Sequence, residues 1–306
     1  MNGILVLEQS LNGLQFGLML FLLAAGLTLV FGIMDMVNLA HGSLYMVGAY
    51  LVATVTSASG SFWWGLGVGM VATAALGVLL ELSLLRRFYQ RDHLSQVLGT
   101  FALLLMANEG VRMVWGSQPI SLNPPPALAG PVELLPGFGY PAYRLFIIGV
   151  GLVVALGLYL LVTRTRLGMQ VRAGASNREM ALAMGVPVRR LFTGVFALGA
   201  ALCALAGGLL GPLLAVQVGM GESILILAFV VIVIGGIGSM RGAFLGALLV
   251  GLVDTAGRTL LPLALQATLG ATAADTVGAA VAPILIYVLM AAVLFWKPRG
   301  LFPAHG

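Results

Sequence analysis

Stretches of about twenty predominantly apolar residues recur along the whole chain, and each is long enough to cross a bilayer as a helix. Such windows lie at about 11–33, 43–59, 62–85, 95–114, 144–163, 192–216, 222–238, 242–258 and 279–296. The stretch 259–278 is apolar but weaker, and the Gly-rich windows are compatible with broken or re-entrant helices. We predict an all-α polytopic membrane protein of about nine spans (eight to ten), with residues 1–306 forming one transmembrane domain.

The composition excludes several functional classes. Hydrophobic residues make up 60% of the 306 positions and charged residues 8%, which leaves too little polar surface to cover a soluble domain. The single cysteine, Cys203, lies in an apolar window, and His41, His93 and His305 are far apart, so no metal site or catalytic group is expected. The start "MNGILVLEQSLNGLQFG" has no basic region, so we expect no cleaved signal peptide.

The basic residues indicate which side of the membrane each loop faces. Twelve of the fifteen lie in alternate loops, and only Arg112, Arg144 and Arg258 lie on the other side. By the positive-inside rule, the side with twelve is cytoplasmic. This predicts an external N-terminus and a cytoplasmic C-terminus, and explains the net charge of +5 without nucleic acid.

The opposite loop, 115–143, contains seven of the thirteen prolines. This density excludes a regular helix and favours extended or turn backbone. The loop is either a rigid external linker or a cap that meets an external partner.

The cytoplasmic loop 164–191 contains "SNREMALAMGVPVRR", which has a marked helix start and stop. Ser176 and Glu179 have the spacing of a capping box, while Gly185 and Pro187 end the helix. About two turns are too short to be stable alone in water. Met180, Ala181 and Met184 are predicted to share an apolar face bordered by Arg172 and Arg178, so we expect the helix to dock on another protein; lying flat on anionic lipid is the alternative.

A polar cluster interrupts the apolar sequence near the first span. Asp35, Asn38 and His41 lie at i, i+3 and i+6, on one face if the segment is helical, and Gly42 and Tyr45 follow. Polar side chains in a membrane bundle face the interior or a water-filled path. They are predicted to line a gate or translocation route; the alternative is that they hydrogen-bond a neighbouring helix and fix its packing.

Glycines recur every four residues late in the chain, at Gly238, Gly242 and Gly246. This small-xxx-small spacing lets transmembrane helices approach closely. The preceding "GGIG" predicts a break, with a tightly packed helix after it.

The chain lacks its own source of energy. A P-loop needs a lysine before Ser or Thr, but Lys297 is the only lysine and Pro298 follows it. An ion-coupled secondary transporter would need unpaired membrane acids. Glu109 has Arg112 at i+3 and Asp254 has Arg258 at i+4, which predicts local ion pairs, and Glu81 lies near the end of its span.

Three sequence blocks carry a resemblance to a known family. "GLTLVFGIMDMVNLAHGSLYMVGAYL" resembles the N-terminal signature of the permease subunits of bacterial branched-chain amino acid ABC importers, and "GMQVRAGASNREMALAMGVPVRRLF" resembles their coupling-helix loop. "VIVIGGIGSMRGAFLGALLVG" resembles their late Gly-rich segment. The chain is more similar to the shorter of the two permease subunits than to the longer one.

The resemblance implies a bacterial inner-membrane permease that pairs with a second, related permease. Two cytoplasmic ATP-binding subunits would carry ATP and Mg²⁺, and an external soluble protein would bind the substrate. The implied substrates are branched-chain or other small neutral amino acids, with urea or short-chain amides as the alternative. Membrane counter-charges are few, so substrate contact here is predicted to be weak. The residues expected to couple to the ATPase are Ser176, Asn177, Arg178, Glu179, Met180, Ala181, Met184, Gly185, Val186 and Pro187.

Overall fold

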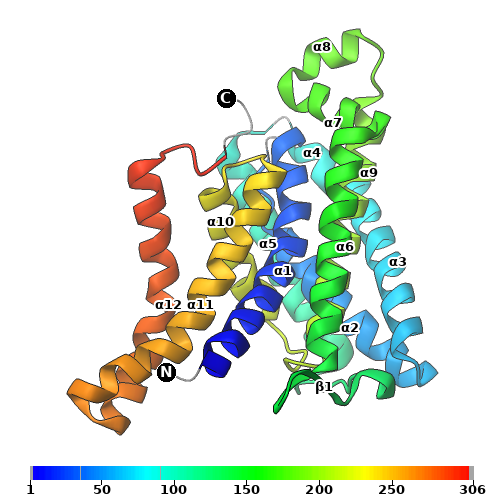
Figure 1. Cartoon of the computed structure of the whole chain (residues 1–306). Helices are drawn as coiled ribbons and strands as arrows, with labels where there is room; N and C mark the ends of the chain where they lie inside the picture. Colours follow the sequence, from blue (N-terminus) through cyan, green and yellow to red (C-terminus); the bar gives the residue numbers. More distant parts are fainter. Residues whose placement is uncertain (1–2, 35, 90, 303–306) are drawn as a thin grey trace. The chain divides into compact units, whose positions relative to one another are not determined.

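Every apolar window of the sequence contains a helix, because a helix satisfies its backbone hydrogen bonds internally in lipid. The computed structural model describes residues 3–34, 36–89 and 91–302. The helices that match the windows are α1 (Gly3–Met34), α2 (Ala40–Ser59), α3 (Phe62–Leu80), α5 (His93–Trp115), α6 (Ala142–Arg164), α9 (Val188–Leu210), α10 (Met220–Gly235), α11 (Met240–Leu269) and α12 (Ala271–Trp296) (Figure 1).

The predicted count of nine spans is not confirmed. Seven helices in the described part of the chain are long and apolar enough to cross a membrane: α1, α3 with its extension to Phe88, α5, α6, α9, α11 and α12. Polar residues such as His41 and Ser43 lower the hydropathy of α2. With 16 residues, α10 is about 24 Å long, shorter than the hydrocarbon core. The structure supports a multi-pass helical membrane protein.

The chain divides into two compact units. The first contains Met1–Phe21, Pro126–Val153 and Phe229–Gly306, and the second contains Leu22–Pro125 and Val154–Ala228. Three continuous helices, α1, α6 and α10, contribute to both units. The single transmembrane domain predicted over residues 1–306 stays a prediction.

In the first unit, α11 and α12 form a helical hairpin that glycines hold closely packed. A Cβ on Gly278 would lie 2.5 Å from Pro262 Cγ, and one on Gly257 would lie 2.8 Å from Leu285 Cδ1. The Pro-rich segment contains an antiparallel pair of strands, β1 (Pro131–Leu135) and β2 (Phe138–Pro141), after the short 3-10 helix η2 (Pro126–Leu128). Residues 116–141 contain no α-helix, as the proline density predicts.

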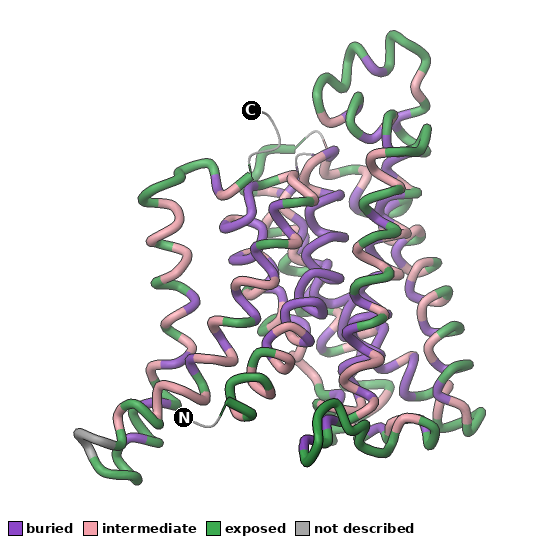
Figure 2. The backbone as a smooth tube through the Cα atoms, in the orientation of Figure 1, coloured by how far each residue is buried: buried purple, intermediate pink, exposed green. Residues whose placement is uncertain are grey.

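In the second unit, α2, α3 and α9 pack against one another in pairs through small residues. A Cβ on Gly48 of α2 would lie 2.6 Å from Ala204 Cα in α9, and one on Gly77 of α3 would lie 2.7 Å from Ala200 Cβ. Such contacts bring helix backbones together in the absence of a hydrophobic driving force between helices. The most apolar window of α9 is 72% buried, against 28% for α3 and 17% for α5, and Figure 2 shows α3 as largely exposed or intermediate.

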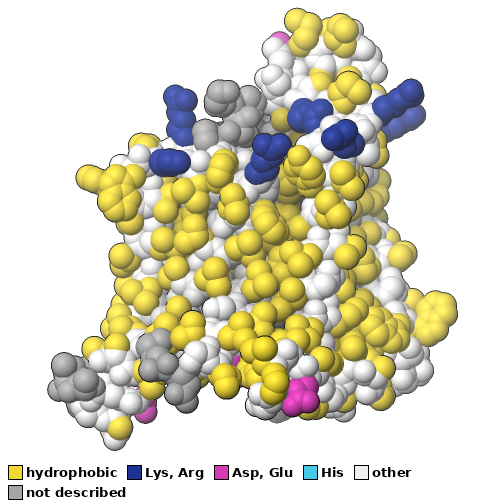
Figure 3. All heavy atoms as spheres, viewed as in Figure 1, with side chains coloured by type: hydrophobic (Ala, Val, Ile, Leu, Met, Phe, Trp, Pro, Cys, Tyr) yellow, Lys and Arg dark blue, Asp and Glu magenta, His cyan; other side chains and the backbone are white. Residues whose placement is uncertain are grey.

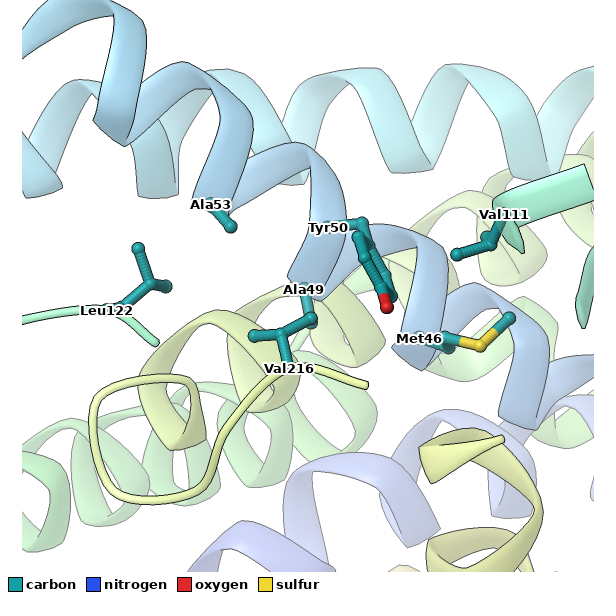
Figure 4. Close-up of a cluster of buried hydrophobic side chains, with 7 residues drawn as sticks. All are labelled: Met46, Ala49, Tyr50, Ala53, Val111, Leu122 and Val216. Atoms are coloured by element: carbon teal, nitrogen blue, oxygen red, sulfur yellow. The ribbon is translucent and has the colours of Figure 1, made fainter. Parts of the chain in front are cut away.

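The core of the second unit joins α2 and α5 to two non-helical segments. Met46, Ala49, Tyr50 and Ala53 of α2 pack with Val111, Leu122 and Val216 (Figure 4). Residues Ile120 and Val216 exchange two backbone hydrogen bonds, with N···O distances of 2.8 and 2.9 Å. Irregular backbone therefore lies beside the middle of α2.

Candidate coupling surface and transport route

The cytoplasmic loop of the sequence forms two short helices, α7 (Arg166–Ser176) and α8 (Arg178–Ala183). The predicted capping box at Ser176 is wrong, because Ser176 is the last residue of α7. Asn177 takes the N-cap position instead: its backbone is extended, and its Oδ1 accepts from Met180 N at 2.9 Å. An asparagine caps as well as a serine, so the helix begins one residue later than predicted.

The predicted end of this helix is confirmed. Gly185 has a φ of +82°, a left-handed conformation that favours glycine. Its N–H donates to Leu182 O, and the Val186 N–H donates to Ala181 O, both at 3.0 Å. This is a Schellman motif, and Pro187 then precedes the first residue of α9.

The predicted apolar face of α8 divides into a buried and an exposed part. Ala181 is 4% exposed, whereas Met180 is 60% and Met184 77% exposed. Leu182 is exposed as well, and hydrophobic side chains gather at the tip of this loop in Figure 3. In the described part of the chain, Met180, Leu182 and the C-cap residue Met184 are therefore exposed on a short, firmly terminated helix.

A chain of side-chain contacts leads from α8 to the end of α3. The Arg178 guanidinium lies over the Phe192 ring at 5.0 Å, and Phe192 meets Tyr89 edge to face at 5.5 Å. The Tyr89 hydroxyl donates to Glu81 Oε1 at 2.8 Å. We call these four residues, Arg178, Phe192, Tyr89 and Glu81, the contact chain.

The last member of the contact chain, Glu81, is fully buried and fully paired. It lies in the π-helical turn η1 (Glu81–Leu85), before the short helix α4 (Arg86–Phe88). Arg86 donates to both carboxylate oxygens, at 3.2 and 3.1 Å, and Thr193 Oγ1 of α9 donates to Oε2 at 2.8 Å. Burial, with the Glu81 hydrogen bond second, raises the pKa of the Tyr89 phenol, so Tyr89 stays a donor.

The two predicted local ion pairs are confirmed. Arg112 Nη1 lies 3.0 Å from Glu109 Oε1, and Arg258 Nε lies 2.9 Å from Asp254 Oδ1. Each pair joins residues one helical turn apart on a single helix. These two acids and Glu81 therefore hold local structure.

The predicted route residues do not share one helical face. Helix α1 ends at Met34, residues 36–38 have no regular structure, and α2 begins at Ala40. Asp35 lies outside the described residues. Asn38 is fully buried, and its Oδ1 accepts from Ala40 N at 3.1 Å. The chain breaks here because the Asn38 side chain satisfies a backbone group at the start of α2.

Behind this break, His41 is enclosed by two glycines and a cysteine. A Cβ on Gly26 would lie 2.9 Å from His41 Nε2, and one on Gly199 would lie 3.2 Å from Cε1. Cys203 Sγ lies 3.1 Å from Nε2, a neighbour that the sequence could not indicate across 162 positions. Tyr45, one turn later, is also buried. His41 Nδ1 and Asn38 Nδ2 have no hydrogen-bond partner among the described residues.

Gly42 brings the start of α2 against the start of α10. A Cβ on Gly42 would lie 2.5 Å from the carbonyl oxygen of Gly221. The next residue, Glu222, accepts a short hydrogen bond of 2.5 Å from Asn108 Nδ2 of α5. Glu222 is not among the site residues predicted from the sequence, because it begins an apolar window and has no charged neighbour at i±3 or i±4.

The glycine triplet is only partly helical. Gly236 and Gly238 have φ values of +104° and +78°, so the predicted break exists and Gly238 lies in the turn before α11. Within α11, a Cβ on Gly242 would lie 2.1 Å from Gly235 O, and one on Gly246 would lie 2.7 Å from Val231 O. Gly242 and Gly246 therefore pack α11 on α10, whereas Gly238 forms the turn.

No three His, Cys, Asp or Glu side chains of the described chain lie together in a way that could hold a metal ion. The two candidate regions therefore consist of an exposed apolar helix and a buried polar break.

Comparison with known proteins gives a consistent set of similarities. The family described as "Branched-chain amino acid transport system / permease component" matches residues 9–295. The chain is 29% identical to the high-affinity branched-chain amino acid transport system permease protein BraD of Pseudomonas aeruginosa, covering 96% of this chain and 95% of BraD. It is 28% identical to the high-affinity branched-chain amino acid transport system permease protein LivH of Escherichia coli K12, and the match covers 81% of this chain and 84% of LivH.

The same system of Escherichia coli K12 includes a second permease protein, LivM, to which the chain is 26% identical over 92% of its own length and 67% of LivM. The match thus covers more of LivH and BraD than of LivM. No solved structure matches the chain.

Proposed function

The chain belongs to the branched-chain amino acid transport system permease family, and from this premise we propose that it is the membrane-spanning subunit of an ATP-driven ABC importer for branched-chain or other small neutral amino acids. One observation carries the assignment to an ATP-driven machine. The chain has no P-loop lysine, yet α8 presents Met180 and Met184 uncovered on a capped helix, as a surface for an ATP-hydrolysing partner would.

The partners of this proposal follow from the same features. LivH and LivM are both named as permease proteins of one transport system, which supports a heterodimer of this chain with a second permease. ATP and Mg²⁺ are bound by two cytoplasmic subunits that contact residues 176–187. A soluble protein outside the bacterial inner membrane delivers the substrate, since this chain offers few fixed charges to select a zwitterion.

The distribution of arginines supports the orientation. In the second unit, nine arginines follow α3 or flank α7 and α8, and arginines surround the base of this loop in Figure 3. The opposite end of α5 carries Arg112, whose charge is neutralised by Glu109. The α7–α8 end is therefore cytoplasmic in our proposal, with the N-terminus outside and the C-terminus inside.

The contact chain supplies the mechanism of coupling. An ATPase that moves α8 displaces Arg178, which is held on Phe192 by a cation–π contact. Phe192 is 1% exposed and its ring contacts Tyr89. The Tyr89 hydroxyl is in turn hydrogen-bonded to Glu81 in the π-helical turn η1, directly after α3. Because buried side chains transmit displacement instead of absorbing it, movement of α8 shifts the end of α3.

The substrate route in this proposal passes the break before α2, where Asn38, His41, Gly42 and Tyr45 lie; Asp35 belongs to the same predicted set. The support is that Asn38 and His41 are buried and incompletely hydrogen-bonded beside closely packed glycines. A small opening of the α2–α9 contact would bring these groups to the substrate.

The experiment is uptake by the reconstituted complex. The permease, its co-encoded second permease and ATPase subunits are placed in liposomes with the binding protein, and ATP-dependent accumulation of labelled leucine and of labelled urea is measured. We expect accumulation of leucine only. Accumulation of urea alone, or leucine uptake driven by an ion gradient without ATP, would contradict the proposal.

Coupling is tested by Phe192→Leu in the same liposomes. The variant removes the ring that meets both Arg178 and Tyr89. ATP hydrolysis is expected to continue while leucine uptake falls at least tenfold. Parallel loss of both activities, or of neither, would exclude the contact chain as the transmission element.

A further inference from the structure

Glu222 differs from three other acids in or beside the described membrane helices, because it forms no ion pair with a described arginine or lysine. Glu81, Glu109 and Asp254 each have an arginine partner. The hydrogen-bond partner that the structure gives the Glu222 side chain is the neutral amide of Asn108, and its side chain is exposed at the surface of the chain. A carboxylate that accepts one hydrogen bond from an amide can accept further hydrogen bonds at its second oxygen.

The position of Glu222 places this charge inside the membrane. Asn108 lies seven residues before the end of the 23-residue helix α5 at Trp115, which is about 10 Å along the helix axis. Helix α10, which carries Glu222 in its first turn, is a shorter apolar helix of 16 residues. We therefore expect it to start within the bilayer, because it follows a non-helical segment that pairs with Ile120 beside the middle of α2.

Two general rules restrict what such a charge can do. Charged side chains at membrane depth face a protein interior or a water-filled path, because exposure to lipid is costly. Discontinuous helices that begin inside the bilayer recur at the substrate sites of transporters, where irregular backbone lines the cavity. Glu222 combines both features, and it follows Gly221, whose carbonyl meets Gly42 of the proposed route.

A second polar group lies in the same region. Tyr50 is fully buried in the cluster that Met220 of α10 also contacts, and its hydroxyl has no hydrogen-bond partner among the described residues. Figure 4 shows the Tyr50 hydroxyl at the Met46 end of the cluster, and Met46 Sδ accepts from Gly219 N at 3.4 Å. This unused hydroxyl therefore belongs to a cluster that packs against Met220, the first residue of α10.

We propose that Glu222, positioned by Asn108, receives the α-ammonium group of the amino acid as it crosses the membrane. This inference rests on the proposed function. It specifies that the α-ammonium group is the part of the substrate that the route recognises. The carboxylate is the complementary partner of an ammonium cation, and a single pair lets the substrate leave again. Urea and amides carry no such cation, so the site favours amino acids over them.

The test uses Glu222→Gln in the reconstituted complex with its binding protein. This variant keeps the shape of the side chain and its contact with Asn108 but removes the charge. Leucine uptake is expected to fall about tenfold or more, since hydrogen bonds to charged groups are the stronger ones. ATP hydrolysis stimulated by the loaded binding protein and co-purification of the ATPase subunits are expected to stay unchanged.

Two further variants separate this role from packing. Glu109→Gln removes a neighbouring carboxylate that already forms an ion pair with Arg112, and this variant is expected to transport leucine normally. Asn108→Ala keeps the Glu222 carboxylate but removes the amide that donates a hydrogen bond to it, and a smaller fall in leucine uptake is expected. Wild-type uptake by Glu222→Gln would overturn the inference, as would loss of uptake together with subunit assembly. Absence of leucine uptake by the wild-type complex would instead refute the proposed function.

Discussion

The α7–α8 loop and the break before α2 reverse the usual distribution of side chains. On α8, the apolar Met180 and Met184 are exposed, while at the break the polar Asn38 and His41 are completely buried. An exposed apolar side chain on a short helix is available to a partner, whereas a buried polar one is held by its surroundings. The first region should therefore tolerate substitution without loss of fold, and the second should not.

The largest expected effect on stability is from Gly48→Ala in α2, the buried helix that follows the break. The new Cβ would lie 2.6 Å from the Ala204 Cα, so α2 and α9 must separate. Overpacking of this kind costs about 1–3 kcal/mol, measured by unfolding in detergent.

The matched control is Gly67→Ala on α3, where a Cβ would meet no atom within 4 Å. It should leave stability unchanged or raise it by up to about 1 kcal/mol through better helix propensity. Equal stability of the two variants would show that close packing does not distinguish the α2–α9 pair.

An intermediate effect is expected at the start of the coupling helix, from Asn177→Ala. The variant removes the acceptor for the Met180 N–H, which costs about 1 kcal/mol locally. Amide hydrogen exchange over 178–183 should accelerate about fivefold, while global unfolding of the chain stays the same. Asn177→Ser should preserve protection, and unchanged exchange in Asn177→Ala would show that contacts other than the cap hold α8.

The smallest effect on stability is expected from replacing both Met180 and Met184 by serine. Because both side chains are exposed, unfolding should change by no more than about 0.5 kcal/mol. Co-purification of the ATPase subunits should nevertheless be lost. Met113→Ser, which alters an equally exposed methionine of α5, should retain the ATPase, and loss of binding in that control would point to nonspecific effects.

The sequence predicted the features that depend on local chemistry. The apolar windows, the end of α8 at Gly185, the break at Gly236 and the pairs Glu109–Arg112 and Asp254–Arg258 all follow from residues close in sequence. The one-residue error at the N-cap has the same origin, since Ser176 and Asn177 are both good capping residues and only the extent of α7 decides between them.

Features that depend on tertiary contacts could not be predicted. Cys203 against His41 and Asn108 against Glu222 join residues more than one hundred positions apart, and neither pair has a recognisable spacing. At the break before α2, the Asn38 side chain accepts a hydrogen bond from the backbone N–H of Ala40, which makes a helical projection of Asp35, Asn38 and His41 misleading. The sequence likewise could not indicate that Ala181 is buried while Met180 and Met184, in the same apolar stretch, are exposed.

The most direct measurement is a disulfide or bifunctional crosslink from Met184→Cys, in a Cys203→Ala background, to the co-expressed ATPase subunits in native membranes. The proposed function predicts a crosslink to an ATPase subunit whose yield changes when ATP is added. Labelling of the cysteine by lipid-phase reagents, with no crosslink to a protein, would contradict it and make α8 an interfacial anchor.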